Sequence, residues 1–144
     1  MPIWIIVLAL SVVIALAGYA FVLWRRVWAA DKQREQRETE RNERLAADIR
    51  FLSQSLLEGQ VPLIEGSIRI KVLLDNYSGP RRNGLQIDIF ERIYDSTSHI
   101  PTHQGWKDLP RSERDQYRAH MDEIERTQRP EIERAAQQLS QGLS

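Results

Sequence analysis

The sequence predicts an all-α protein in which an N-terminal transmembrane helix continues through a charged stalk into a small helical bundle. Three observations lead to this fold class. An apolar run opens the chain, charged and amide side chains follow it, and hydrophobic residues then recur at helical intervals. The predicted parts are residues 1–26 as a single transmembrane anchor, residues 27–44 as the stalk, and residues 45–144 as a small cytoplasmic α-helical domain.

The apolar run from Ile3 to Trp24 contains no charged side chain. As an α-helix it would extend about 33 Å, which is enough to cross a hydrocarbon core of about 30 Å. A cleaved secretory signal would carry positive charge before a shorter apolar core, and Met1 and Pro2 provide none. We therefore expect a retained membrane anchor.

The flanks of this run predict its orientation. Arg25 and Arg26 directly follow Trp24, and basic residues beside a span favour the cytoplasmic side. We expect a single-pass protein of the bacterial inner membrane, with the N-terminus outside and the C-terminal domain in the cytoplasm. Trp4, Trp24 and Trp28 suit the aromatic belts at the two membrane interfaces. The lipid bilayer is thus the first expected partner.

The charge balance and the absence of cysteine exclude several functional classes for this protein. From Val27 to Ser144 there are 18 basic and 20 acidic side chains, which gives no reason to expect nucleic acid as a partner. The absence of cysteine excludes disulfides, thiolate catalysis and cysteine-bound zinc. No cofactor is expected.

The segment from Ala29 to Arg44 predicts a solvated helical stalk. Its residues are mostly strong helix formers, without glycine or proline. Opposite charges recur three or four residues apart, the spacing at which helical side chains meet. No apolar residue for a coiled-coil seam occurs from Asp31 to Arg44.

The domain begins where hydrophobic residues return at helical spacing. This first stripe consists of Leu45, Ile49, Leu52 and Leu56. Gly59 is a typical stop after a helix, so one helix is expected from the span to about Glu58.

The segment from Leu63 to Tyr77 fits two structures. Its apolar residues at 68, 70 and 72 alternate with cations, as in a half-buried strand. A helical stripe also accounts for it, with Val72 widening the apolar face. We favour the helix, because the run is long and because acid/base pairs recur at i,i+4. These pairs are Glu65 with Arg69 and Lys71 with Asp75.

A loop and a third helix should follow. The loop from Gly79 to Gly84 carries Arg81 and Arg82, which we expect in solvent. Within residues 85–98 a third stripe is predicted. It consists of Ile87, Phe90, Ile93 and Tyr94.

A long charged helix should close the domain between Pro110 and Leu139. Proline removes a backbone donor, so Pro130 is expected to kink this helix or split it into two segments near Arg129. The last four residues, 141–144, are expected to fray.

The segment from His99 to Leu109 carries the candidate metal ligands. Asp95, His99 and His103 are spaced by four residues, which would align them on one helix. Pro101 disfavours that helix, and Thr102 instead fits the N-cap of a short turn through Trp106. We therefore assign no metal site and keep His99, His103 and Asp95 as the alternative.

No serine elbow, zinc-protease helix, glycine-rich nucleotide loop or kinase motif occurs. Their absence argues against an enzyme, and no catalytic or cofactor-binding residue is assigned.

Three segments in this order resemble the bacterial domain-of-unknown-function family 2489. They are Glu65 to Asp75 (EGSIRIKVLLD), His99 to His103 (HIPTH) and Leu109 to Arg114 (LPRSER).

The resemblance covers nearly the whole chain and implies the same layout of span, stalk and small domain, without an activity, substrate or cofactor. It directs attention to the polar positions within those segments, for which we favour structural roles. These positions are Glu65, Arg69, Asp75, His99, Thr102 and His103.

The leading hypothesis is a membrane-anchored cytoplasmic domain that acts as an interaction, scaffold or adaptor module for another protein. The first alternative is a membrane-tethered enzyme or metal site that uses His99 and His103 with nearby carboxylates. The second is a homo-oligomeric membrane protein joined through the small residues Ser11, Ala15 and Gly18 on one face of the span.

Overall fold

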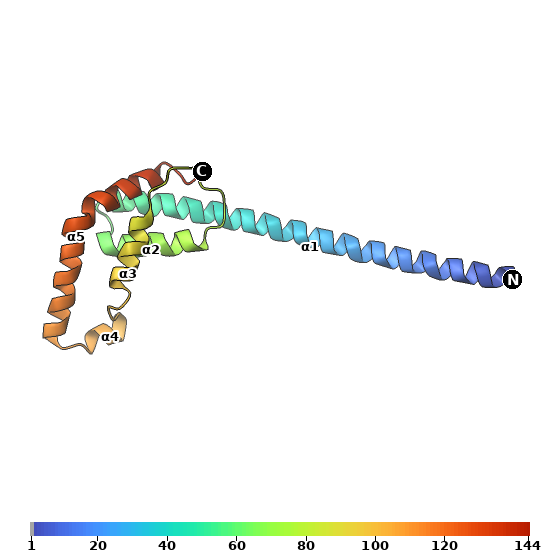
Figure 1. Ribbon diagram of the computed structural model, residues 1–144, viewed down its shortest axis with the longest axis horizontal. Coiled ribbons are helices and arrows are strands. Elements are labelled where there is room, and N and C mark those ends of the chain that lie inside the picture. Colours follow the sequence, from blue (N-terminus) through green and yellow to red (C-terminus); the bar gives the residue numbers. More distant parts are fainter. Residues whose placement is uncertain (1) are drawn as a thin grey trace. The chain divides into compact units, whose positions relative to one another are not determined.

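The protein is all-α, as predicted. The computed structural model describes residues 2–144, and within this range five helices and no strand form. The helices are α1 (Ile3–Leu57), α2 (Leu63–Asn76), α3 (Asp88–Thr97), α4 (His103–Lys107) and α5 (Arg111–Ser140) (Figure 1). The chain divides into two compact units, Met1–Arg41 and Asn42–Ser144, which are described separately.

The first unit is the N-terminal part of α1. Its side chains from Ile3 to Arg41 are exposed, including the large apolar ones. Within residues 2–144, α1 is the one helix long and apolar enough to cross a membrane. In water this surface would be costly to expose, whereas in hydrocarbon it matches its surroundings.

The second unit begins with the last turns of α1. Ile49 and Leu56 of the predicted first stripe are buried, and Leu45 and Leu52 pack against them. The helix ends at Leu57, and Gly59 then takes a φ of 74°, a left-handed conformation that glycine adopts at little cost. The predicted extent of this helix is thus confirmed.

The segment whose sequence fitted both strand and helix forms α2. Leu63, Ile64, Ile70 and Leu74 are buried on one side of it. Val72 differs from expectation, because it is 46% exposed and lies at the edge of the stripe. The neighbouring stripe residues already fill the contact with the core, so Val72 faces outward.

The third helix supplies the centre of the core. It begins at Asp88, and Ile89, Phe90 and Ile93 are almost completely buried. Ile87, which the sequence placed on the stripe, instead precedes the helix and is only partly buried. Helix α3 packs against both α2 and α5.

The closing helix α5 is one element, so of the two outcomes expected at Pro130 the helix bends and does not split (Figure 1). It contains Pro130 in its interior, and Figure 1 shows it changing direction along its length. Proline removes a single ladder hydrogen bond. Ile124 and Ile132 are buried on either side of Pro130 and hold both halves of α5 on the core. The helix therefore continues past the missing hydrogen bond.

The C-terminus is packed at Leu143, contrary to the expectation that the last four residues would fray. Leu143 is 3% exposed and belongs to the core. Its carbonyl oxygen accepts a hydrogen bond from the backbone N–H of Arg82 at 2.6 Å. A buried leucine and a long-range backbone bond outweigh the tendency of a chain end to be mobile.

Candidate functional site

Two of the predicted polar positions, Glu65 and Arg69, form an ion pair on the surface of α2. Arg69 Nη2 lies 2.5 Å from Glu65 Oε1, and the two side chains are 61% and 50% exposed respectively. Exposed pairs one helical turn apart stabilise a helix by about 0.5 kcal/mol or less. Both side chains remain accessible to a binding partner.

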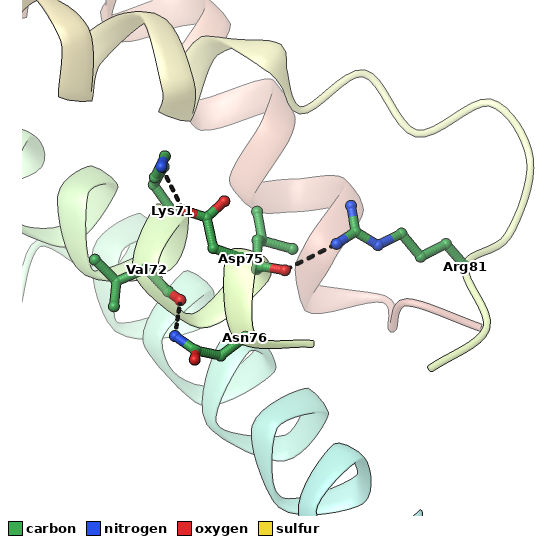
Figure 2. Close-up of polar contacts among 6 residues, drawn as sticks. Lys71, Val72, Asp75, Asn76 and Arg81 are labelled. Carbon is green, nitrogen blue, oxygen red and sulfur yellow. Dashed lines mark hydrogen bonds and ion pairs between the residues drawn. The ribbon is translucent and has the colours of Figure 1, made fainter. Parts of the chain in front are cut away.

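A third predicted position, Asp75, pairs with Lys71 one turn earlier on α2 (Figure 2). The Lys71 ammonium also lies 4.4 Å from the centroid of the Tyr94 ring on α3. The hydrogen bond to Asp75 raises the pKa of Lys71 above its usual range. This arrangement joins α2 to α3 and keeps the lysine charged, so it fits a structural role better than proton transfer near neutral pH.

Helix α4 and the beginning of α5 lie at the end of the domain away from the C-terminus (Figure 1), and His99 precedes α4 in the chain. The His99 ring lies 5.9 Å from the rings of both Tyr117 and His120, measured between centroids. His120 Nε2 lies 3.2 Å from the carbonyl oxygen of Ser96. His99 is therefore placed among aromatic rings of α5.

Thr102 and His103 open the short helix α4. Thr102 occupies the N-cap position as predicted, but its side chain makes no capping hydrogen bond. His103 has a φ of 51°, a left-handed conformation, so the chain does not enter α4 with regular capping geometry. Both residues are exposed.

The structure does not gather a set of metal ligands. Among residues 2–144, no group of three histidine, aspartate or glutamate side chains lies close enough to hold an ion. The spacing of Asp95, His99 and His103 would align them only on one continuous helix. Helix α3 ends at Thr97 and α4 begins at His103, so the chain turns between the proposed ligands.

The two arginines that we expected in solvent both bond to helix ends, and only Arg82 departs from the expected exposure. Arg81 Nη2 donates to the carbonyl oxygen of Leu74 at 2.9 Å, in the last turn of α2 (Figure 2). Arg82 Nη2 donates to the carbonyl oxygen of Gln138 at 2.5 Å, in the last turn of α5. Cations stabilise helix C-termini because carbonyl groups there lack helical partners. Arg81 remains exposed, whereas Arg82 is half-buried.

An exposed apolar surface lies on the second unit. Among residues 42–144, the large hydrophobic side chains that are exposed are Phe51, at 74%, and Val72, at 46%. Phe51 follows the buried Ile49 by two residues, which turns it about 200° around α1 and away from the core. We name the exposed side chains of Phe51 and Val72 the Phe51 surface. Our sequence interpretation missed Phe51, although an aromatic residue opposite the stripe was visible in the sequence.

The Phe51 side chain lines two grooves. One groove, of about 660 Å³, lies between α1 and the last three residues, and Ala47, Phe51 and Leu143 contribute to it. The other, of about 480 Å³, lies between α1 and α2. It is lined by Asp48, Phe51, Leu52, Ile68, Arg69, Val72 and Leu73. The predicted position Arg69 therefore belongs to the rim of an apolar groove.

In the first unit, the predicted anchor residues lie along α1. The rings of Trp24 and Trp28 meet edge to face, with centroids 6.0 Å apart. Trp4 and Arg25 are exposed, as is Arg26. The hydroxyl of Ser11 donates to the carbonyl oxygen of Val7 at 2.7 Å and is satisfied within its own helix.

These features define an all-helical protein with one apolar helix that could span a membrane and a small domain with an exposed apolar surface. Residues 13–139 match the family described as "Protein of unknown function (DUF2489)", and the chain belongs to this family. No curated protein and no solved structure matches the chain. The match confirms the resemblance seen in the sequence and adds no activity.

Proposed function

We propose that the protein is a membrane-anchored interaction module whose small domain binds a protein partner through the Phe51 surface. The observation that carries this proposal is the 74% exposure of Phe51 on the part of α1 whose opposite face buries Ile49 and Leu56 in the core. Small domains gain stability by burying aromatic side chains, so a phenylalanine held in solvent suggests selection for something other than folding.

The surroundings of Phe51 fit a protein contact. Apolar side chains of both α1 and α2 lie in the groove beside it, and Asp48 and Arg69 stand at its edge. Exposed apolar patches with a charged rim are typical of protein-binding sites, and aromatic residues are enriched at the centres of interfaces.

The anchor is the second part of the proposal. We place Ile3 to Trp24 across the bacterial inner membrane, with Arg25 and Arg26 on the cytoplasmic side. Trp4 would lie at the outer interface, and Trp24 and Trp28 at the inner one. The domain would then recruit or position its partner at the cytoplasmic face of the membrane.

The test is site-specific photocrosslinking of the full chain in living cells. A photoreactive amino acid is placed at Phe51 or Val72, and at the exposed Gln116 on α5 as the control. We expect discrete protein adducts from the first two positions and none from position 116. Equal adducts at all three positions, or none at Phe51, would contradict the proposal.

A further inference from the structure

The groove between α1 and α2 carries opposite charges on its two walls. Asp48 comes from α1 and Arg69 from α2, with apolar side chains between them. Arg69 is paired with Glu65, and its side chain is still 61% exposed. Asp48 is exposed and makes no ion pair within residues 2–144. A complementary surface would therefore offer a cation near Asp48 and an anion near Arg69.

A second copy of the same groove, related to the first by a two-fold axis, would place a cation near Asp48 and an anion near Arg69. We propose that a second copy of this chain occupies the groove, with the Phe51 side chain of each copy in the α1/α2 groove of the other. In such an isologous contact Asp48 of one copy faces Arg69 of the other, and the reverse pair forms automatically. This inference rests on the proposed function, because it names the occupant of the Phe51 surface.

The chemistry of the surface supports this occupant. The groove offers apolar contact to an aromatic ring, and the ring that projects beside it is Phe51. The rim carries one charge of each sign, so two identical surfaces attract where a rim of a single sign would repel. The chain as a whole adds no strong repulsion, since its basic and acidic side chains are equal in number at 20 each.

The experiment measures the mass of the full chain, purified in detergent and in lipid nanodiscs, over a range of protein concentrations. We expect a dimer that dissociates on dilution. Phe51→Asp should raise the dissociation constant about thirtyfold or more, as for a residue at the centre of an interface. The control Gln116→Asp introduces the same charge on an exposed site of α5 and should leave the dissociation constant unchanged.

Charge reversal then tests the two-fold geometry. Asp48→Arg and Arg69→Asp should each weaken self-association, because each places like charges opposite one another. When the two variants are mixed, both contacts become attractive again, so a mixed dimer should form at near wild-type affinity. The absence of cysteine allows each variant to carry one engineered thiol for a different dye, and energy transfer then reports the mixed dimer. Circular dichroism checks that every variant is folded.

The outcomes separate this inference from the proposed function. A monomer at every concentration, together with photoadducts to a different protein at Phe51, would overturn the two-fold contact and leave the interaction module standing. A dimer that is insensitive to Phe51→Asp, or charge variants that do not recover on mixing, would also overturn it. A monomer without photoadducts at Phe51 would remove both proposals.

Discussion

Arg82 and Gln138 join the loop after α2 to the end of α5, because the Arg82 guanidinium donates to the Gln138 carbonyl oxygen 2.5 Å away. The Gln138 side chain makes a second bond to the same loop, because its Oε1 accepts a hydrogen bond from the Gln86 N–H at 2.8 Å. Residues about 50 positions apart in the chain thus hold each other, and the loop is fixed to the helix that closes the domain.

The Arg82 cap should contribute measurably to stability. Arg82→Ala leaves the Gln138 carbonyl without its charged donor in a half-buried place, and we expect the free energy of unfolding to fall by about 1–3 kcal/mol. Urea unfolding followed by circular dichroism measures this change. Asn83→Ala, at the exposed neighbouring position, should have little effect, and equal losses for the two variants would contradict the cap.

The two faces of α1 should respond oppositely to truncation. Ile49→Ala opens a cavity at a residue that is 0% exposed and should cost about 2–5 kcal/mol. Phe51→Ala removes a larger side chain but should change the free energy of unfolding by less than about 0.5 kcal/mol, because the ring is in solvent. The comparison is made by urea unfolding at a protein concentration at which the chain is monomeric. A large loss at Phe51 there would show that the ring is buried within its own chain.

The packed C-terminus should be required for full stability. Removing Leu143 and Ser144 exposes part of the core and takes the acceptor from the Arg82 N–H, so the unfolding free energy should fall by about 2–4 kcal/mol. Removing Ser144 alone is the control, and it should be nearly neutral because this residue is exposed. Thermal unfolding of the three chains distinguishes the packed tail from a frayed one, for which both deletions would be silent.

The Lys71–Asp75 pair predicts a loss of stability in alkali. Because the pKa of Lys71 is raised in the folded protein, its contribution is complete below the unfolded pKa of about 10.4 and is lost as pH rises through the folded value. Unfolding midpoints are measured from neutral pH to about pH 12. Lys71→Met should flatten part of the alkaline decline. Lys107→Met, at an exposed site without an ion pair in the described chain, should retain that decline.

The proposed orientation in the membrane can be tested with single cysteines in this cysteine-free chain. Pro2→Cys should react with a membrane-impermeant maleimide in intact spheroplasts, and Gln36→Cys should react only after the membrane is permeabilised. Labelling of residue 36 in intact spheroplasts would reverse the orientation. Recovery of the full chain in the soluble fraction would remove the anchor.

The local pattern of residues was enough to determine the helical class. The spacing of Leu45, Ile49 and Leu56 predicted the apolar face of α1, and the length of the run after Pro62 favoured the helix that α2 forms. These features depend on side chains within a few turns of one another, so the sequence carries them directly. The outward position of Phe51 is also a feature that the sequence carries, because its place opposite the stripe follows from helical geometry.

Only the tertiary structure decided what the irregular segments do. Arg81 is exposed as expected, but its bond to the end of α2 and the partial burial of Arg82 at the end of α5 depend on contacts made only in the folded structure. Leu143 is buried and Pro130 stays within one helix because distant parts of the core hold them. Packing also brought Asp48 and Arg69 to one groove, since each helix alone shows only an ordinary exposed charge. Such contacts join residues far apart in the chain, and local periodicity contains no information about them.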